Sequence, residues 1–373
     1  MTLVETGFGK VADTFFRTVA DDGRTGAELS VWVDGKPVVD LWSGIADERS
    51  GRAFAFDTPM VTFSCTKGMA SVLVAMLMER GALPALDTPT VDIWPEFGAH
   101  GKDRITIGDA LAHRAGLSAP RRDLTIEEVL DNELMADAIA VQEPLWAPGE
   151  HHQYHAVTHG AITGKLVALA TGRPIRDCFA ELIARPLKAE AWIGLPDTEV
   201  PRVAHVVTDT LEGEPPKGDP ESIAWMERAI DLGCGITFDK FNEPRFHRAG
   251  IAGVTGIATA NALARIWSAT VTTTNGVRLI GDSTMEALRE VRSEGPPFFA
   301  DPPPYQRWGA GVMVPSDWDR YLSPSSFGHD GAGGQVAFAD VDAKVGFAYL
   351  TNRMADDWDL GKRVTAALAD ALG

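Results

Sequence analysis

The chain has 373 residues, of which 45% are hydrophobic, so it can bury a large core and is long enough for two domains or one large interleaved one. A formal net charge of -18 argues against binding the phosphate backbone of nucleic acid or an anionic membrane surface. Three cysteines, odd in number and far apart, favour a reducing compartment over a disulfide framework. The N-terminus lacks a signal-peptide pattern, and the longest apolar run, Met69 to Met78, is too short to cross a bilayer. We therefore expect a soluble, cytoplasmic protein.

The chain is predicted to open with a helix followed by two paired strands. Val11 to Val19 has helical periodicity. Leu29 to Val33 and Val38 to Leu41 have strand character, and Asp34-Gly35 between them is a strong signal for a two-residue hairpin. Helical patterns then dominate from Met69 to about Trp225.

Strand character returns near the end of the chain. Gly309 to Val314, Gln335 to Phe338 and Val345 to Leu350 are predicted strands, and a final helix is expected over Asp357 to Leu372. His329 to Gly334 is predicted to be a glycine-rich turn that leads into the strand at Gln335.

Strands at both ends with helices between them predict an α+β fold. We expect one antiparallel sheet, flanked by helices and built from the N- and C-terminal segments, with a mainly helical region inserted into it. Residues 1–68 and 245–373 would form the sheet domain and residues 69–244 the helical insertion. An active site is expected between the two.

Ser64-Cys65-Thr66-Lys67 is the most informative motif. If Ser64 opens the apolar helix that follows, the three-residue step places its hydroxyl and the amine of Lys67 on one helix face, so that the amine can take the serine proton. The alternative is a serine that caps the helix, with a surface lysine one turn later. Cys65 should point away from Ser64 and is expected to be a packed residue.

A serine nucleophile also needs a group that protonates the leaving group, and donors for the oxyanion. Two segments offer them. Tyr154 follows Trp146-Ala147-Pro148-Gly149 in a loop that leads into a helix, and His329-Asp330-Gly331-Ala332 precedes a late strand. Each segment alone is unremarkable.

Taken together and in this order, these motifs resemble the serine β-lactamase-like superfamily, in which Ser-x-x-Lys is an active-site signature. The resemblance is to the branch that contains class C β-lactamases, family VIII carboxylesterases and D-aminopeptidases, and it is strongest to the family VIII esterases. It covers nearly the whole chain. Further matching segments are Leu111 to Leu117, Trp146 to Gly149, Arg185 to Leu187, Gly253 to Arg265 and Phe327 to Asn352.

The resemblance implies that Ser64 is the nucleophile, Lys67 its base partner and Tyr154 the proton shuttle. It also implies that His329-Asp330-Gly331 replaces a Lys-Thr-Gly motif, and that the backbone N–H groups of Ser64 and Ala332 form the oxyanion hole. His329 and Gly331 would contact the substrate. Lysine and tyrosine both need a shifted pKa to act as a base near neutral pH, and the sequence leaves open which of them takes the proton.

Two departures from the family pattern bear on the substrate. Ala156 stands where Tyr-x-Asn has its asparagine, and His329 stands where Lys-Thr-Gly has its lysine. Without that amide donor and permanent cation, the site should hold a β-lactam carboxylate poorly. We therefore expect a carboxylesterase that cleaves short-chain acyl or aryl esters, a small-molecule substrate, through an acyl-enzyme on Ser64.

Other readings remain open. β-Lactam hydrolysis, cleavage of D-amino-acid amides and acyl transfer share the acyl-enzyme, and a penicillin-binding-type binder without turnover would keep the fold. His151, His152, His155 and His159 cluster, but they lack the His-Glu-x-x-His pattern, so no metal site and no cofactor are predicted. An α/β-hydrolase is excluded because Gly-x-Ser-x-Gly is absent. A homo-oligomer is possible.

Overall fold

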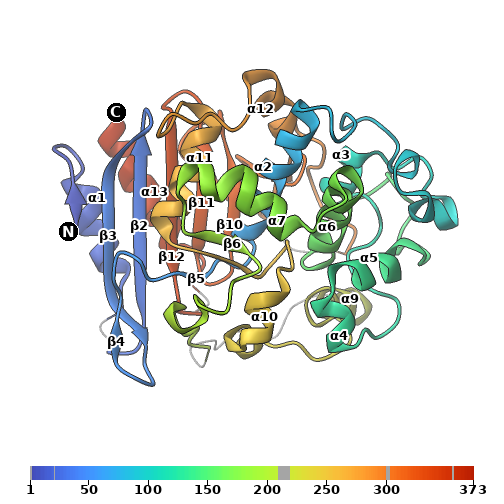
Figure 1. Cartoon of the computed structure of the whole chain (residues 1–373), viewed down its shortest axis with the longest axis horizontal. Helices are drawn as coiled ribbons and strands as arrows, with labels where there is room; N and C mark the ends of the chain where they lie inside the picture. The colour runs from blue at the N-terminus through green and yellow to red at the C-terminus, as the bar shows by residue number, and fades with distance from the viewer. Residues whose placement is uncertain (1, 21, 209–218, 300–302, 355–356) are drawn as a thin grey trace.

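The computed structural model describes residues 2–20, 22–208, 219–299, 303–354 and 357–373. An antiparallel sheet runs through it, joining strands from both ends of the chain (Figure 1). In spatial order the described strands are β1 (Leu3–Val4), β3 (Lys36–Asp47), β2 (Gly26–Val33), β12 (Val345–Thr351), β11 (Gln335–Asp340), β10 (Ser326–Gly331), β9 (Met313–Val314) and β8 (Arg307–Trp308), and β4 (Arg52–Ala53) pairs with β3. The predicted fold class, with its sheet built from both termini, is therefore confirmed.

The hairpin between β2 and β3 forms where the sequence predicts it. Asp34 and Gly35 both have positive φ angles, 46° and 75°, which a tight hairpin turn requires. Val33 and Lys36 are paired directly across the turn. β12, the last strand in the sequence, then pairs with β2 inside the sheet, so residues more than 300 positions apart in the sequence become neighbours.

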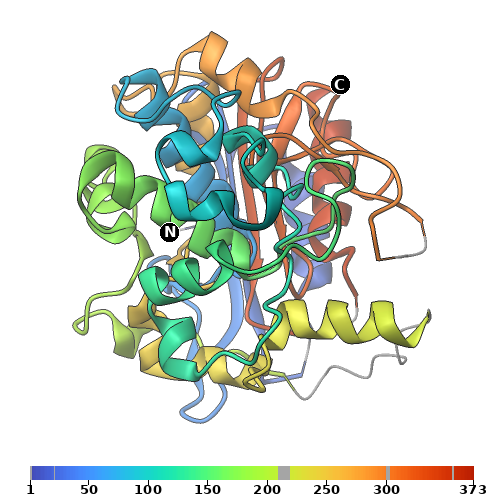
Figure 2. The same cartoon turned by 90° about the vertical axis from the view of Figure 1, so that its right-hand side faces the viewer.

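Helices cover both faces of the sheet (Figures 1 and 2). On one face, α1 (Gly9–Thr18) and α13 (Leu360–Leu372) pack on large residues such as Phe347 and Tyr349. On the other face lies α11 (Ala260–Val271), whose backbone comes so close to β12 that a side chain at Gly346 would meet the Ala264 carbonyl. Successive side chains of β12 point to opposite faces of the sheet, so Phe347 and Tyr349 face α1 and α13 while Gly346 faces α11.

The segment between the two halves of the sheet is mainly helical, as predicted, although residues 209–218 lie outside the described residues. None of the described helices is long and apolar enough to span a bilayer. The predicted boundaries between the sheet domain and the helical insertion, at residues 68 and 244, stay a prediction. The remaining helices are α2 (Cys65–Glu79), α3 (Ile107–Leu111), α4 (Ile126–Leu130), α5 (Asn132–Ala140), α6 (Thr158–Thr171), α7 (Ile175–Phe179), α8 (Arg185–Leu187), α9 (Pro220–Asp231), α10 (Pro244–Ala249) and α12 (Asp282–Arg289).

A second, smaller sheet lies beside the N-terminus of α2. Its order is β5 (Met60–Val61), β7 (Gly256–Ala258) and β6 (Ala191–Ile193). The Thr62 N–H donates to the Gly256 carbonyl at 2.8 Å, and the Thr66 hydroxyl accepts from the Gly256 N–H at 2.9 Å. These bonds fix the chain on both sides of Ser64.

Two local predictions were wrong in part. Of the expected strand Gly309 to Val314, only Met313–Val314 is a strand, β9, and residues 309–312 connect it to β8 through a bond from the Gly309 N–H to the Val312 carbonyl. His329 to Gly331 belong to β10 and not to a turn, which covers only residues 332–334. Glycine lowers strand propensity, but here a side chain at Gly328 would collide with the Ala337 carbonyl of β11.

Candidate active site

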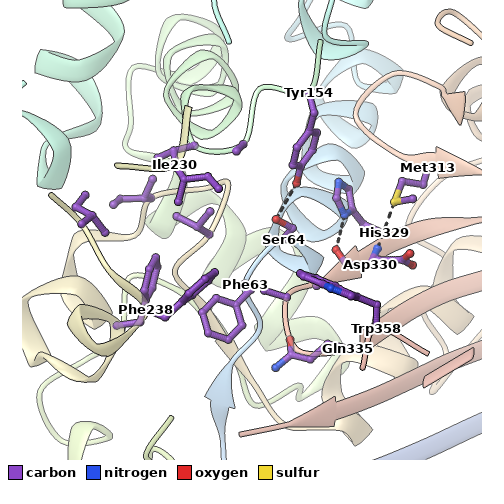
Figure 3. Close-up of a pocket in the computed structure, with 18 of the residues that line it drawn as sticks. Phe63, Ser64, Tyr154, Ile230, Phe238, Met313, His329, Asp330, Gln335 and Trp358 are labelled. Carbon is purple, nitrogen blue, oxygen red and sulfur yellow. Dashed lines mark hydrogen bonds between the residues drawn. The ribbon is translucent and has the colours of Figure 1, made fainter. Parts of the chain in front are cut away.

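Ser64 lies at the N-terminus of α2, as predicted, but its side chain does not cap the helix. Phe63, just before it, has a φ angle of 41°, a left-handed conformation that turns the chain sharply from β5 into α2. The Ser64 hydroxyl is instead bonded to two other side chains. Its Oγ lies 3.1 Å from the Nζ of Lys67. It also lies 2.7 Å from the Oη of Tyr154, as the dashed line in Figure 3 shows. The capping interpretation of Ser64 is therefore wrong.

Lys67 is fully buried next to Ser64. Its Nζ donates to the carbonyls of Ala156, at 2.6 Å, and Gly253, at 2.9 Å. Among the described residues, no carboxylate lies within ion-pair distance of it. Burial away from water therefore lowers the pKa of Lys67 well below its usual range. A neutral amine has two N–H groups, which suit the two carbonyls, and one lone pair, which is left for the Ser64 hydroxyl.

Tyr154 is the second side chain that contacts the Ser64 hydroxyl, and its ring lies close to the Lys67 Nζ, 4.8 Å from the ring centroid. Its ring stacks on Trp308, with centroids 5.1 Å apart and planes 11° apart, and meets the His113 ring edge-on at 5.1 Å. Burial raises the pKa of Tyr154, so the phenol stays protonated and donates to the Ser64 Oγ. The Ser64 Oγ thus accepts from the Tyr154 hydroxyl and lies within hydrogen-bond distance of the Lys67 Nζ.

Strand β10 forms the other wall of the site. A side chain at Gly331 would lie 2.9 Å from the Thr62 carbonyl and 3.1 Å from the Cys65 Sγ, so only glycine fits beside the start of α2. The Cys65 thiol points to β10 and donates to the His329 carbonyl at 3.1 Å, and burial raises its pKa. Cys65 is a packed residue here, as expected from the sequence.

The predicted oxyanion donors are available. The Ser64 and Ala332 N–H groups donate to no protein acceptor within the described parts of the chain. Ala332 directly follows β10, next to the start of α2, and lines the same cavity as Ser64. Two such N–H groups beside a serine hydroxyl are suited to stabilising negative charge on a carbonyl oxygen.

His329 is a neutral imidazole. Its Nδ1 lies 2.7 Å from the Asp330 carbonyl, to which it must donate, and burial lowers its pKa to about 3. The neighbouring Asp330 carboxyl accepts bonds from Trp318 and Tyr321, both at 3.0 Å, and burial raises its pKa to about 7. Position 329 therefore lacks the permanent cation that the lysine of a Lys-Thr-Gly motif provides.

A cavity of about 660 Å³ opens over Ser64. Figure 3 shows that its lining differs on the two sides of the serine. One side, called the apolar arm, includes Phe63, Ile230 and Phe238, together with Phe241, which contacts the Phe63 ring. The other, called the tryptophan side, includes Met313, Asp330 and Trp358, together with Trp318, which is bonded to Asp330, Lys362, which lies over the Trp318 ring, and Trp308, which contacts the His329 ring.

The structure thus brings all six predicted site residues to one cavity. Ser64, Tyr154, His329, Gly331 and Ala332 line it, and Lys67 lies buried behind Ser64. Their chemical roles stay predictions. No group of His, Cys, Asp and Glu side chains suited to a metal occurs among the described residues.

Sequence reasoning missed several groups that shape the site. The carbonyls of Ala156 and Gly253 had no signal, because any residue offers a backbone carbonyl. Trp308 had none either, since an isolated tryptophan does not indicate what it will stack on. His155, one of the clustered histidines, is used structurally: its Nε2 accepts from the Leu117 N–H at 3.2 Å, and its Nδ1 bonds the Gln153 carbonyl at 2.6 Å.

Comparison with known protein families identifies the family to which this chain belongs. The model of the family described as Beta-lactamase matches residues 11–371. The chain belongs to the β-lactamase family. The predicted resemblance to this superfamily is confirmed, and the match spans the sheet and the helices between its two halves.

Three similar proteins illustrate the relationship. The esterase/β-lactamase LipL of Mycobacterium tuberculosis is 30% identical over 349 residues, which cover 88% of this chain and 77% of that protein. The structure of EstA from Arthrobacter nitroguajacolicus is 29% identical, with a TM-score of 0.89 over 100% of this chain and 98% of that one. A family VIII carboxylesterase structure is 28% identical, also with a TM-score of 0.89, over 100% and 99% of the two chains.

Proposed function

We propose that this β-lactamase-fold serine hydrolase is a carboxylesterase that works through an acyl-enzyme on Ser64. The observation that carries the proposal is the position of the Ser64 Oγ between the Lys67 Nζ, at 3.1 Å, and the Tyr154 Oη, at 2.7 Å, at the base of a mainly apolar cavity. The similarity to proteins named as esterases supports it.

In the first step, the Ser64 Oγ attacks the ester carbonyl while the neutral Lys67 amine takes its proton. The Oγ–C bond forms, and the carbonyl oxygen becomes an oxyanion that the Ser64 and Ala332 N–H groups stabilise. When the intermediate collapses, the C–O bond to the alcohol breaks and Tyr154 protonates the leaving alkoxide. The proton held by Lys67, whose Nζ lies 4.8 Å from the centre of the Tyr154 ring, then restores the phenol.

In the second step, water replaces the alcohol. One water proton passes to the Tyr154–Lys67 pair, and the hydroxide oxygen bonds to the acyl carbon. Collapse of this intermediate breaks the Oγ–C bond, returns the proton to Ser64 and releases the carboxylic acid. Each group ends in the state in which it began, so the same three side chains serve both steps.

Two features favour esters over β-lactams. The Ala156 methyl group offers no amide donor, and burial lowers the pKa of His329 to about 3, so the imidazole carries no charge to pair with a lactam carboxylate. β-Lactam hydrolysis remains the second candidate, because the name of the Mycobacterium tuberculosis relative includes it.

The test compares three variants with the unchanged chain on para-nitrophenyl butyrate. Ser64→Ala removes the nucleophile and should abolish turnover. Tyr154→Phe removes only the proton donor and should lower kcat by about 10²- to 10⁴-fold. Ser71→Ala is the matched control, because it removes a buried hydroxyl from the same helix that bonds the Gly311 carbonyl and lies outside the proposed mechanism.

The site is also tested by covalent labelling. A para-nitrophenyl alkylphosphonate should modify Ser64 stoichiometrically, as read by intact-protein mass, and should leave the Ser64→Ala variant unmodified. Full butyrate turnover by Ser64→Ala, or equal losses in Ser64→Ala and Ser71→Ala, would contradict the proposal. Labelling without turnover of any ester would indicate a binder instead.

A further inference from the structure

The cavity is chemically asymmetric about Ser64. The charged residues that line it are Asp239, Asp330 and Lys362 among the described residues. Asp330 and Lys362 belong to the tryptophan side, where the Lys362 Nζ lies over the Trp318 ring at 4.6 Å and donates to the Trp318 carbonyl at 2.7 Å. Asp239 is exposed, and the other described residues of the apolar arm are uncharged.

Aromatic rings wall the apolar arm. Phe63 meets Phe238 edge-on at 5.7 Å and Phe241 at 5.3 Å, with interplanar angles of 82° and 64°. Phe241 in turn contacts Phe246 at 5.6 Å. This contiguous group of rings, together with Ile230 on α9, presents carbon surface on the left of Ser64 in Figure 3.

The proposed mechanism fixes which part of an ester enters each side. The tetrahedral carbon bonded to Ser64 has three other substituents: the oxyanion, the alcohol oxygen and the acyl chain. The oxyanion points to the Ser64 and Ala332 N–H groups. The alcohol oxygen must be within hydrogen-bond reach of Tyr154, because Lys67 is fully buried and the phenol is the proton donor exposed to the cavity. Only the direction of the apolar arm is left for the acyl chain.

We propose that the substrate is an ester of a bulky, uncharged, apolar carboxylic acid, whose aryl, branched or medium-chain acyl group fills the apolar arm while its alcohol lies on the tryptophan side. This inference rests on the proposed function and names its substrate class. A small acetyl group would leave the arm to water, which an apolar wall binds poorly, so a larger acyl group gains from displacing that water. For acyl groups with an α-ammonium, as in D-amino-acid amides, the only carboxylate that the described residues of this arm offer is the exposed Asp239.

Two matched variants test the assignment. Phe238→Ala trims the apolar arm and Trp358→Ala trims the tryptophan side; each removes one partly exposed aromatic side chain that lines the cavity. One ester series varies the acyl group, as para-nitrophenyl acetate, hexanoate and benzoate. The other varies the alcohol, as the hexanoates of ethanol, 1-hexanol and 2-phenylethanol, followed by proton release.

For the unchanged chain, kcat/KM should be at least about tenfold higher for the hexanoate and benzoate than for the acetate. Phe238→Ala should reduce this acyl preference several-fold while leaving the acetate rate within about twofold. Trp358→Ala should keep the acyl preference and change only the alcohol series. A preference for acetate, or loss of the acyl preference in Trp358→Ala instead of Phe238→Ala, would overturn the assignment.

A second measurement decides the assignment even if no ester is turned over. In para-nitrophenyl alkylphosphonates the alkyl chain on phosphorus takes the place of the acyl chain: the Ser64 Oγ–P bond forms and para-nitrophenolate leaves. Labelling by the hexylphosphonate should be at least about tenfold faster than by the methylphosphonate, and Phe238→Ala should remove most of this difference. Equal rates for the two reagents would overturn the inference, whereas failure of ester turnover alone would overturn only the proposed esterase function.

Discussion

Lys67 shows how a single buried group sets the chemistry of the site. As an ammonium ion it would donate a hydrogen bond to each of its three partners, and without a lone pair it could not accept a proton from Ser64. Because it is surrounded by protein and has two carbonyl acceptors instead of a carboxylate, the neutral amine is favoured. The sequence leaves open whether Lys67 or Tyr154 is the base. The lowered pKa of Lys67 and the raised pKa of the Tyr154 phenol support the proposal that Lys67 takes the serine proton.

The pH dependence of activity follows from this. The pKa of Lys67 is lowered, so the active, neutral amine should persist well below the ordinary lysine pKa of 10.5, and kcat/KM should fall only as the pH drops through the lowered value. Lys67→Met should abolish turnover at every pH. Both effects are measured by a profile of kcat/KM between pH 5 and 10. The same ester, one whose turnover depends on Ser64, is used at every pH.

Lys102 provides the matched control. It is also buried, its Nζ donates to the Ala99 and Gln142 carbonyls at 2.6 Å, and burial lowers its pKa to about 8. It does not line the cavity. Lys102→Met should therefore cost stability but keep kcat/KM and its pH profile, and equal loss of activity in the two variants would refute the role given to Lys67.

At the scale of elements, helix α6 holds the acceptor of Lys67 in place. Gly160 of α6 packs directly against the backbone of Gly253, whose carbonyl accepts from the Lys67 Nζ. A side chain at Gly160 would collide with the Gly253 N–H. The close approach of two backbones, made possible by two glycines, thus positions a carbonyl that accepts a hydrogen bond from the Lys67 Nζ.

Gly160→Ala should therefore weaken both the fold and the site. The collision should destabilise the protein by about 1–3 kcal/mol and lower kcat/KM by displacing the Gly253 carbonyl. Gly172→Ala is the control at the end of the same helix: its φ of 68° disfavours alanine, but nothing lies within 4 Å of the new side chain. It should cost about 1 kcal/mol by urea unfolding with kcat/KM unchanged. Unchanged activity in Gly160→Ala would argue against the coupling.

At the scale of the whole molecule, a layer of buried, neutral histidines lies behind the site. His113, His155 and His159 have ring centroids 5.1–5.4 Å from one another where they are in contact, and burial lowers the pKa of each. Charging any of them inside the folded protein is unfavourable, whereas the unfolded chain takes up protons at the ordinary histidine pKa of 6.5.

The stability of the protein should fall with acidity in a defined window. The folded-state pKa of His155 is lowered to about 4, so between pH 6.5 and 4 the unfolded state binds one more proton at this residue, and the stability it contributes above pH 6.5 is lost as the pH falls. Each such histidine adds about 1.4 kcal/mol per pH unit to the slope.

His155→Gln should reduce the slope of unfolding free energy against pH by about one proton, and the exposed His151→Gln should leave it unchanged. Urea unfolding at several pH values between 4.5 and 7.5 measures the slopes. If the two variants gave the same slope as the unchanged chain, the acid sensitivity would have to come from other groups.

Local patterns predicted much of the fold. The Asp34-Gly35 hairpin and the strands near Gln335 and Val345 are confirmed, because turn chemistry and alternation act over a few neighbouring residues. The strand β10 was missed because Gly328 and Gly331 weaken its local signal. Glycine is required at these two positions because a larger side chain would collide with β11 or with the start of α2. Those segments contact the two glycines only in the folded protein.

The amino-acid sequence by itself determined that the side chains of Ser64 and Lys67 lie on the same face of a helix. A spacing of three residues has this effect in any helix, whatever surrounds it. It also carried the order of motifs that identifies the family. Only the tertiary structure decided that the lysine is buried, which lowers its pKa, that Trp308 and His113 contact the Tyr154 ring, and that an apolar arm adjoins the serine. Protonation states and cavities depend on which distant segments exclude water from a group, and no local pattern encodes that.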